Sequence, residues 1–411
     1  MELEFTASEK VRSAIARIGR TEDVQFSPDG ERLAVAGFRE NRLLILGIET
    51  NLDSEPPTIA LTGPLELESD ALVLPHGLCW IDDRTLVVAN REGLVAIFEL
   101  PEKAASGKIR VSPVRILGGQ ATDLIKTPGS VSAAAVGLDL VELFVCNNYV
   151  HHVSRHLVDR RNDYALVASE MAIHDGLEVP DGVMVSPSGR WIAISNHGHA
   201  HVRIYRNDAE LGPASRPQAV LKGVNYPHGV RFTADERTIL VADAGRPFVQ
   251  LYRSDGPWEG EREPDVSIRV ISEESFARGS YNHYEGGPKG LDVTRDGRLM
   301  VISCHEEPFA FFDMRAVLKL GGVAAPADRP ESDGAREALL RYLAADRSRV
   351  EQATMAIRLA SKHDIGLVLN SPSYRITAPL RWARSTLRKA NPWRLTRNAW
   401  ARRRDRRSGA G

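Results

Sequence analysis

Two histidines of this sequence, His76 and His228, stand in the same tripeptide, Pro-His-Gly, although about 150 residues separate them. A neutral imidazole accepts a proton near pH 7 or binds a metal ion through its free nitrogen. Two carboxylates, Glu22 and Asp181, occupy the equivalent position in two related motifs. Histidine and carboxylate side chains bind zinc, iron and manganese, and carboxylates also bind calcium. If the fold brings the four together, they predict a divalent-metal site with His76 or His228 as ligand or general base.

The motif is part of a repeat that covers the first 320 residues. In each copy the motif is followed by an apolar segment, then by a polar turn such as that at 186–189, and then by further segments of alternating character. Such alternation predicts strands, and four strands in about 50 residues are typical of a propeller blade. We therefore predict an all-β protein, a six-bladed β-propeller over residues 1–322. Residues 11–18 are predicted to be a strand that completes the last blade and hides both sheet edges. The middle residues of the six motifs are Glu22, His76, Gly129, Asp181, His228 and Lys289.

The motif also predicts where its middle side chains point. Proline fixes φ and glycine lets neighbouring backbones approach closely, so the middle residues should meet at one end of the central channel, the channel mouth. A second ring is expected 14–15 residues further on, at the end of each second strand. Its side chains, together with Lys289, are predicted to bind substrate, and the alternative for them is the capping of turns. The ring comprises Gly37, Asn90, Asn147 (after a short insertion), Asn196, Asp243 and Cys304.

The pattern P-x-G…D-G…V-A-D over residues 11–315 resembles six-bladed propellers of the NHL-repeat type and of the senescence-marker-protein/gluconolactonase family. The resemblance implies a lactonase-like hydrolase in which Glu22 and Asp181 match metal-binding positions. The family's P-N-G is absent here, and His76 and His228 stand where its asparagine is expected. Peptide-amidating lyases, which are also NHL propellers, bind zinc through histidines at the channel mouth, so histidine is not foreign to this position.

Other interpretations of these residues remain open. An ion pair between Lys289 and Glu22 would neutralise the charge that a metal needs, and small polar residues also line water-filled channels. A second histidine group, at 197–201 with the pattern HxHxH, predicts either chelation on one face of a strand or solvated loop residues. His151, His152 and His156 hold the equivalent place in the preceding copy. The motifs GxSxG, HExxH, GxGxxG and the P-loop do not occur.

Composition sets the wider class of the protein. Its three cysteines lack CxxC spacing, which predicts neither a disulfide framework nor a zinc–cysteine site. No apolar run approaches the roughly 20 residues of a membrane span, and the N-terminus lacks an apolar segment of signal-peptide length, so a cytoplasmic location is expected. The total charge of −1 conceals an asymmetry. Residues 371–411 carry twelve basic residues and one acid, a net +11, which leaves −12 on residues 1–370.

The C-terminal part is predicted to be an appendage to the propeller: a linker at 323–334, a helix at 335–363 and a basic tail at 364–411. Residues 371–381 resemble a tail of bacterial glycosyltransferases and related proteins of surface-polysaccharide assembly, which implies such proteins as partners. Arginines interleaved with Trp382, Trp393 and Trp400 suit an anionic membrane, so a peripheral position at the inner face is expected. Nucleic acid is disfavoured because the body is acidic, and a solubilising, disordered tail is the alternative.

Two functions follow from these patterns. The first is a lactonase-like, metal-dependent hydrolase of a sugar-derived or other small polar substrate. The second is a non-catalytic binding or scaffold propeller that serves membrane-associated polysaccharide synthesis. The ring with Glu22, Asp181 and two histidines favours the first, and the tail favours the second.

Overall fold

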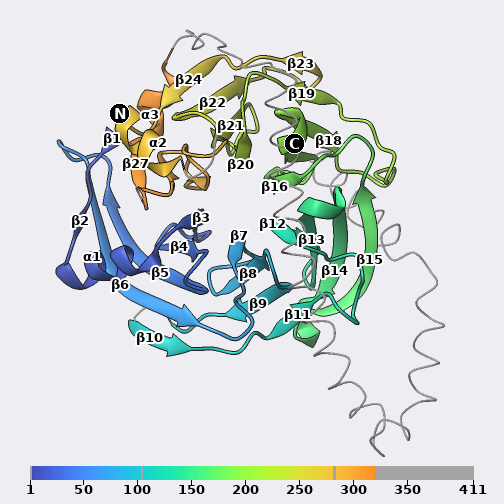
Figure 1. The fold of residues 1–411 in the computed structure, drawn as a ribbon, viewed down its shortest axis with the longest axis horizontal. Helices are drawn as coiled ribbons and strands as arrows, with labels where there is room; N and C mark the ends of the chain where they lie inside the picture. The colour runs from blue at the N-terminus through green and yellow to red at the C-terminus, as the bar shows by residue number, and fades with distance from the viewer. Residues whose placement is uncertain (1, 103–104, 281–283, 307, 321–411) are drawn as a thin grey trace, which may run out of the picture.

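The computed structural model describes residues 2–102, 105–280, 284–306 and 308–320. The predicted linker at 323–334, helix at 335–363 and tail at 364–411 lie outside the described residues. Six sheets surround a central axis (Figure 1), which confirms the predicted six-bladed β-propeller. Within the described ranges, no helix combines the length and the apolar character that a membrane span requires.

Each blade begins with an innermost strand at the axis, and its following strands step outward in antiparallel order. The first blade contains β3 (Thr21–Phe26), β4 (Arg32–Gly37), β5 (Arg42–Asn51) and β6 (Thr58–Glu68). The second contains β7 (Pro75–Trp80), β8 (Thr85–Asn90), β9 (Val95–Glu99) and β11 (Arg115–Leu117). The third contains β12 (Pro128–Val136), β13 (Leu140–Asn147), β14 (His152–Asp159) and β15 (Ala165–Ile173).

The remaining blades follow the same plan. The fourth contains β16 (Pro180–Val185), β17 (Trp191–Asn196), β18 (His201–Arg206), β19 (Ala219–Leu221) and the parallel strand β23 (Gly260–Arg262). The fifth contains β20 (Pro227–Phe232), β21 (Thr238–Asp243), β22 (Phe248–Arg253) and β24 (Val266–Arg269). The sixth contains β25 (Leu291–Val293), β26 (Leu299–Ile302), β27 (Ala310–Asp313) and β1 (Glu2–Leu3).

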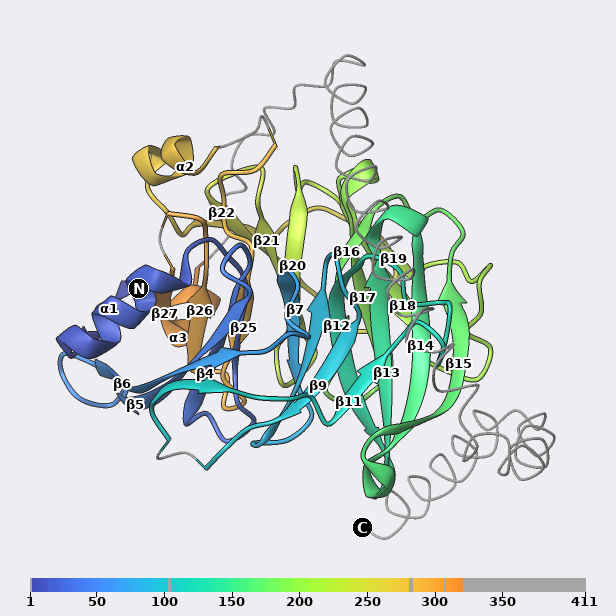
Figure 2. The same cartoon turned by 60° about the horizontal axis from the view of Figure 1, so that its bottom comes forward.

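Short elements complete the fold. β2 (Thr6–Ala7) and β10 (Gly107–Arg110) pair in parallel with β6 and lengthen the outer edge of the first blade. Figure 2 shows α1 beside the outer strands of this blade and α2 projecting from the ring. The helices are α1 (Glu9–Ile18), α2 (Glu273–Gly279) and α3 (Met314–Leu318), and the 3-10 turns are η1 (Asn148–Val150), η2 (Arg160–Asn162) and η3 (His197–His199).

The ring is closed by the N-terminus, but not by the predicted residues. β1 pairs antiparallel with β27, Glu2 opposite Phe312 and Leu3 opposite Phe311. The prediction of a strand at 11–18 is wrong, because these residues lie in α1. Ser8 caps that helix by accepting a hydrogen bond from the Val11 amide. The apolar residues of α1 repeat at helical spacing, and the face that they form packs on the first blade.

The apolar core is divided into wedges between neighbouring blades. Between the sixth and the first blade, for example, Val35 and Leu44 lie in one cluster with Val301 and Phe311. All four side chains are fully buried. Because each wedge is shared by two blades, packing fixes the angle between them and thereby the position of the innermost strands around the axis.

Inside the channel, side chains of the innermost strands join one blade to the next. Asp23 Oδ2 accepts the Leu78 amide at 2.9 Å, and Ser132 Oγ accepts the Val185 amide at 3.0 Å. Asp292 Oδ2 closes the circle by accepting the Phe26 amide of the first blade at 2.8 Å. These bonds satisfy backbone donors that no strand pairing reaches, and they hold the innermost strands in register with one another.

Candidate functional site

A β-bulge near the start of each of the first five innermost strands directs the middle residue of the motif. In the second blade Pro75 lies opposite Asn90 and Gly77 opposite Ala89, so His76 is one residue in excess. The same excess of one residue occurs in β3, β12, β16 and β20. Bulges re-aim side chains, and they are enriched next to functional sites. The bulge is therefore the local cause of the convergence that the motif predicts.

The glycine of the motif permits the close approach of neighbouring innermost strands. A Cβ atom on Gly77 would lie 2.5 Å from Ser130 Cα, and one on Gly182 would lie 2.2 Å from the carbonyl oxygen of His228. Both contacts are with backbone of the next blade, which cannot move aside without opening the wedge. The expected role of this glycine is confirmed.

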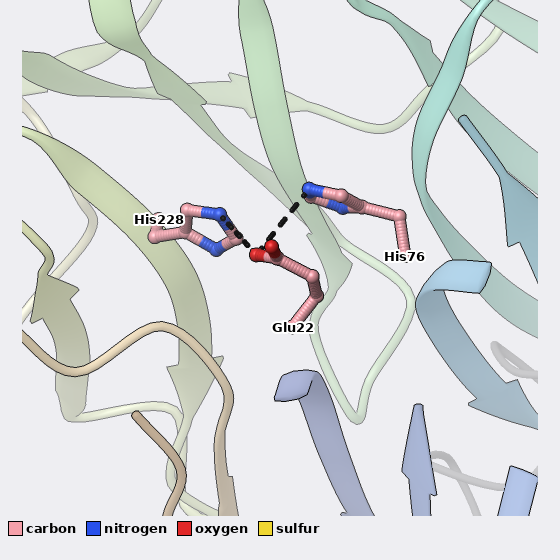
Figure 3. Close-up of side chains that lie close together, drawn as sticks. All are labelled: Glu22, His76 and His228. Carbon is pink, nitrogen blue, oxygen red and sulfur yellow. Dashed lines mark ion pairs between the residues drawn. The ribbon is translucent and has the colours of Figure 1, made fainter. Parts of the chain in front are cut away.

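Three of the four predicted metal ligands come together at the channel mouth. Donor atoms of Glu22, His76 and His228 all lie within 4.8 Å of one another. Figure 3 shows the Glu22 carboxylate between the two imidazoles, with its Oε2 3.6 Å from His76 Nε2 and 3.5 Å from His228 Nε2. All three side chains are buried. Two imidazoles and one carboxylate form a donor set that suits zinc, manganese or iron.

The hydrogen bonds of His76 fix its tautomer. Nδ1 lies 2.7 Å from the carbonyl oxygen of Gly129, which can only accept, so Nδ1 carries the proton. The lone pair of Nε2 therefore faces the site, where it accepts a hydrogen bond from Arg91 Nη2. Many metal-binding histidines donate one ring nitrogen to a backbone carbonyl and coordinate through the other. In His76 that other nitrogen is held by Arg91.

Asp181, the fourth predicted ligand, lies beside this cluster. Its Oδ2 is 3.1 Å from His228 Nε2. Its Oδ1 accepts hydrogen bonds from Arg91 Nη2 at 3.0 Å and from Asn148 Nδ2 at 2.5 Å. The carboxylate is thus held on one side and directed at the His228 imidazole on the other.

Cations balance the carboxylates of the mouth. Lys289 Nζ lies 3.0 Å from Glu22 Oε2 and 2.6 Å from Glu285 Oε2, so the ion pair considered from the sequence exists. Arg20 contacts Glu22 through Nε and Glu285 through Nη2, the latter at 3.2 Å. With Arg91 and Asp181, the described groups of the mouth comprise three cations and three carboxylates.

Burial and charge set the protonation states here. Burial opposes ionisation of Glu22, but Arg20 and Lys289 hold the pKa of its carboxyl well below the usual range. Burial also opposes ionisation of Asp181, and the neighbouring imidazoles and Arg91 outweigh it, so that pKa too is well below the usual value. Burial, reinforced by Arg91, lowers the pKa of His76 to about 3, and burial lowers the pKa of His228. The site therefore presents ionised carboxylates and neutral imidazoles at pH 7.

Five members of the predicted second ring end their second strands as expected, whereas Cys304 lies two residues past the end of β26. The asparagine and aspartate side chains of the ring hold the backbone of the adjoining loops. Asn90 Oδ1 accepts the Val73 amide at 3.1 Å, and Asn147 Oδ1 and Asn196 Oδ1 accept the amides of Lys126 and Glu178 at 2.7 Å. Asp243 accepts the amides of Asn225 and Tyr226. These are the contacts of turn capping, the alternative interpretation. Substrate binding by Asn90, Asn147, Asn196 and Asp243 stays a prediction that none of these contacts supports.

The residue after each of the three asparagines reaches the mouth instead. Arg91 contacts His76 and Asp181, Asn148 contacts Asp181, and His197 Nε2 lies 3.6 Å from Asp181 Oδ2. Successive side chains of a strand point to opposite sides, so a ring displaced by one residue faces the axis. The sequence signal was present in the pairs Asn90-Arg91, Asn147-Asn148 and Asn196-His197.

His197 is the one member of the HxHxH group that enters the site. Its ring packs on Tyr226 with centroids 3.9 Å apart, and its Nε2 has no hydrogen-bond partner among the described residues. Asn148 Oδ1 is likewise buried without a described hydrogen-bond partner. His201 Nε2 instead accepts a hydrogen bond from Arg203 Nε at 2.9 Å, and His199 faces Glu178. The group therefore does not converge as a chelate.

A cleft of about 660 Å³ lies between the fourth and fifth blades, at the end of the propeller opposite the mouth. Its acidic Glu236 accepts the Ser188 amide and pairs with Arg190, and Trp258 donates to the Glu236 carbonyl. These polar groups join turns to one another, which makes the cleft a weaker candidate than the mouth.

Comparison with protein families gives one match. The model of the lipoprotein LpqB β-propeller domain matches residues 4–139, which run from β2 to the end of β12 and hold the first two blades. This supports the propeller architecture and leaves activity open. No curated protein matches the chain.

Proposed function

We propose that this propeller is a metal-dependent hydrolase with its active centre at the channel mouth, acting on a small polar, sugar-derived ester or lactone. The observation that carries the proposal is the buried convergence of Glu22, His76 and His228 within one coordination sphere. Two neutral imidazoles and one carboxylate leave at least one position for water or substrate, as in catalytic zinc sites.

The described residues fit a metal in their chemistry as well as their number. Metal ligands must be deprotonated, and the lowered pKa values of His76, His228 and Glu22 keep them so. Nitrogen donors favour zinc, manganese or iron over calcium, which takes oxygen ligands. When bound, such an ion polarises a carbonyl group and lowers the pKa of a coordinated water.

Hydrolysis needs a base, and Asp181 is placed for it. Its Oδ2 lies 3.1 Å from His228 Nε2, beside the proposed ligands, while Arg91 and Asn148 hold its other oxygen. As the water oxygen bonds to the acyl carbon, the Asp181 carboxylate accepts the water proton. The proton then passes to the leaving alkoxide as the acyl carbon–oxygen bond breaks, and a hydroxy acid results.

Lys289 would donate to the oxygen that becomes negative in this reaction by exchanging one of its carboxylate acceptors for that oxygen. Its ammonium group is buried beside Glu22 and has three N–H donors. These donors bond to both carboxylate oxygens of Glu22 and to one oxygen of Glu285. A fixed cation in a water-poor site stabilises developing charge with little reorganisation.

The test is the metal content of the purified protein followed by lactone hydrolysis in a pH-stat. We expect about one zinc, manganese or iron per chain after loading. Glu22→Gln and His228→Gln should weaken metal binding by more than about 100-fold. His201→Gln is the matched control, because its nitrogen pairs with Arg203 rather than with the mouth. Absence of metal in wild type under every loading condition would refute the proposal.

The alternative is a non-catalytic binding propeller, and the ion pairs of the mouth favour it. Lys289 and Arg20 already neutralise Glu22, so the site is balanced without a metal. A mouth that binds a small polar ligand without metal and does not hydrolyse it would support this alternative. The cytoplasmic location, the anionic membrane surface and the polysaccharide-assembly partners predicted from the tail belong to this second proposal.

A further inference from the structure

The charges of the mouth restrict the ligand that a metal-loaded site accepts. Three cations, Arg20, Arg91 and Lys289, pair with the carboxylates of Glu22, Asp181 and Glu285. The described cluster is therefore electrically balanced before any metal binds. A divalent ion adds two positive charges to a buried site, where uncompensated charge is expensive.

Arg91 is the residue that the metal would displace. Its Nη2 donates to the one lone pair of His76 Nε2, and a metal ligated by that nitrogen must take the same lone pair. The guanidinium keeps its contacts with Asp181 Oδ1 and with the Tyr149 hydroxyl, 3.3 Å from Nη1. The bond from Arg91 Nη2 to His76 would be lost, and that donor could bond to a ligand of the metal-loaded site.

Two buried acceptor atoms border the same space. His197 Nε2 and Asn148 Oδ1 have no hydrogen-bond partner among the described residues, and both side chains contact Asp181. Such atoms are costly in a closed interior, and a hydroxyl group, which both donates and accepts, can bond to either of them. Polar donors on a ligand would satisfy them.

We propose that the substrate carries a carboxylate or phosphate group beside its hydroxyls, and that Arg91 and the bound metal hold this anionic group together. A planar guanidinium recognises carboxylate and phosphate in the same way, through parallel N–H donors. The inference rests on the proposed metal-dependent function. It identifies the substrate class as acidic sugar derivatives and gives Arg91 the role of a specificity residue.

The experiment is calorimetric titration of the full chain, with and without zinc, at constant ionic strength. The probes are glycolate for a carboxylate, glycerol 1-phosphate for a phosphate, and glycolamide as the neutral counterpart of glycolate. We expect an anion to bind at least tenfold more tightly to the zinc-loaded protein than to the zinc-free protein. Because coupling is reciprocal, the same anion should tighten zinc binding by the same factor.

The variant Arg91→Gln separates the contribution of the guanidinium to anion binding from that of zinc. Arg203→Gln is the matched control. Arg203 also donates to a histidine, His201, but its other hydrogen bond goes to the carbonyl oxygen of Asp175 rather than to Asp181 or the proposed metal ligands. We expect Arg91→Gln to weaken anion binding by roughly tenfold or more. It should leave zinc binding equal or tighter, because the competitor for His76 Nε2 is gone. Arg203→Gln should change neither.

The outcomes distinguish the two proposals. Zinc binding with equal affinity for glycolate and glycolamide, or anion binding unaffected by zinc, overturns the anionic substrate and leaves the metal site standing. Failure of zinc to bind the wild-type chain overturns the proposed function itself. Preference between glycolate and glycerol 1-phosphate assigns the anionic group. These readings use wild-type protein, so they hold even if Arg91→Gln does not fold.

Discussion

Glu22 and Asp23 are neighbours on one strand and are both buried, yet their carboxyl groups behave in opposite ways. Glu22 faces the mouth, where Arg20 and Lys289 keep its pKa well below the usual range. Asp23 lies in the next layer of the channel, where burial raises its pKa to about 6 although Arg231 opposes this. Asp292 shares that guanidinium, and burial raises its pKa as well.

The difference shows that burial alone does not decide the charge of a buried acid. At the mouth there is one cation for each carboxylate, whereas in the lower layer one guanidinium serves two. In the lower layer, backbone amides help to stabilise the two carboxyl groups. Asp23 accepts hydrogen bonds from the amides of Val24 and Leu78, and Asp292 accepts one from the amide of Phe26. The lower layer, made by Asp23, Arg231 and Asp292, joins neighbouring blades. The mouth holds titratable groups of the kind that bind ligands.

The strongest test of this comparison is removal of the shared cation. Arg231→Met leaves Asp23 and Asp292 buried without a counter-ion, so the free energy of unfolding should fall by about 3–5 kcal/mol. Chemical denaturation measures it. Arg237→Met is the control, because that arginine is exposed in the following turn and should matter by less than about 0.5 kcal/mol. Equal losses in both variants would mean that the lower layer does not depend on its ion pairs.

The pH dependence of stability sharpens the comparison further. Burial lowers the pKa of His76 and His156 to about 3 and that of His197 to about 4. The unfolded chain binds protons near pH 6.5, so below that pH each of these histidines lowers the free energy of unfolding by about 1.4 kcal/mol per pH unit. Asp23 acts in the opposite direction, because its folded pKa is raised and protonation between about pH 6 and 4 favours the folded state.

We expect a net loss of about 3 kcal/mol between pH 6.5 and 5.5, measured by urea denaturation at each pH. Asp23→Asn removes the opposing contribution, so its profile should be steeper than that of wild type below pH 6. A flat profile over this range would show that the buried histidines become protonated in the folded protein.

The smallest effect is expected at the mouth itself. Phenylalanine at position 197 keeps the ring that packs on Tyr226 and removes the nitrogen that lacks a described hydrogen-bond partner. His197→Phe should therefore change the free energy of unfolding by less than about 0.5 kcal/mol, or raise it. Ligand binding and hydrolysis should fall. A stability loss above about 2 kcal/mol would place His197 among the structural residues.

The architecture was predictable because short sequence patterns that determine local structure recur in every blade. The motif, the polar turn and the alternating strands recur in each blade, and each signal acts within a few residues of itself. The same reasoning failed for residues 11–18, where a short apolar segment between polar residues was interpreted as a strand although Ser8 and Glu9 mark a helix start. The closing strand, Glu2–Leu3, is too short for any periodicity to reveal.

The site was predictable in its first ring and not in its second. Glu22, His76 and His228 follow from the motif, as does the neutralising Lys289, because one bulge per strand repeats. The second ring depends on which of two successive side chains turns inward, Asn90 or Arg91 for example. The choice depends on a loop, because Asn90 accepts a hydrogen bond from the amide of Val73, 17 residues earlier in the chain. No local sequence pattern encodes this contact.

The pairing of β1 with β27 also orders events during synthesis. The two residues that close the ring are synthesised before the first blade, and their partners Phe311 and Phe312 are made only after five blades are complete. Until then the nascent chain is an open arc, with an unprotected edge at its start. Closure is therefore a late event with a large separation in sequence, which slows it. A truncated product of translation that ends before β27 lacks the partner strand and exposes that edge to proteases and chaperones.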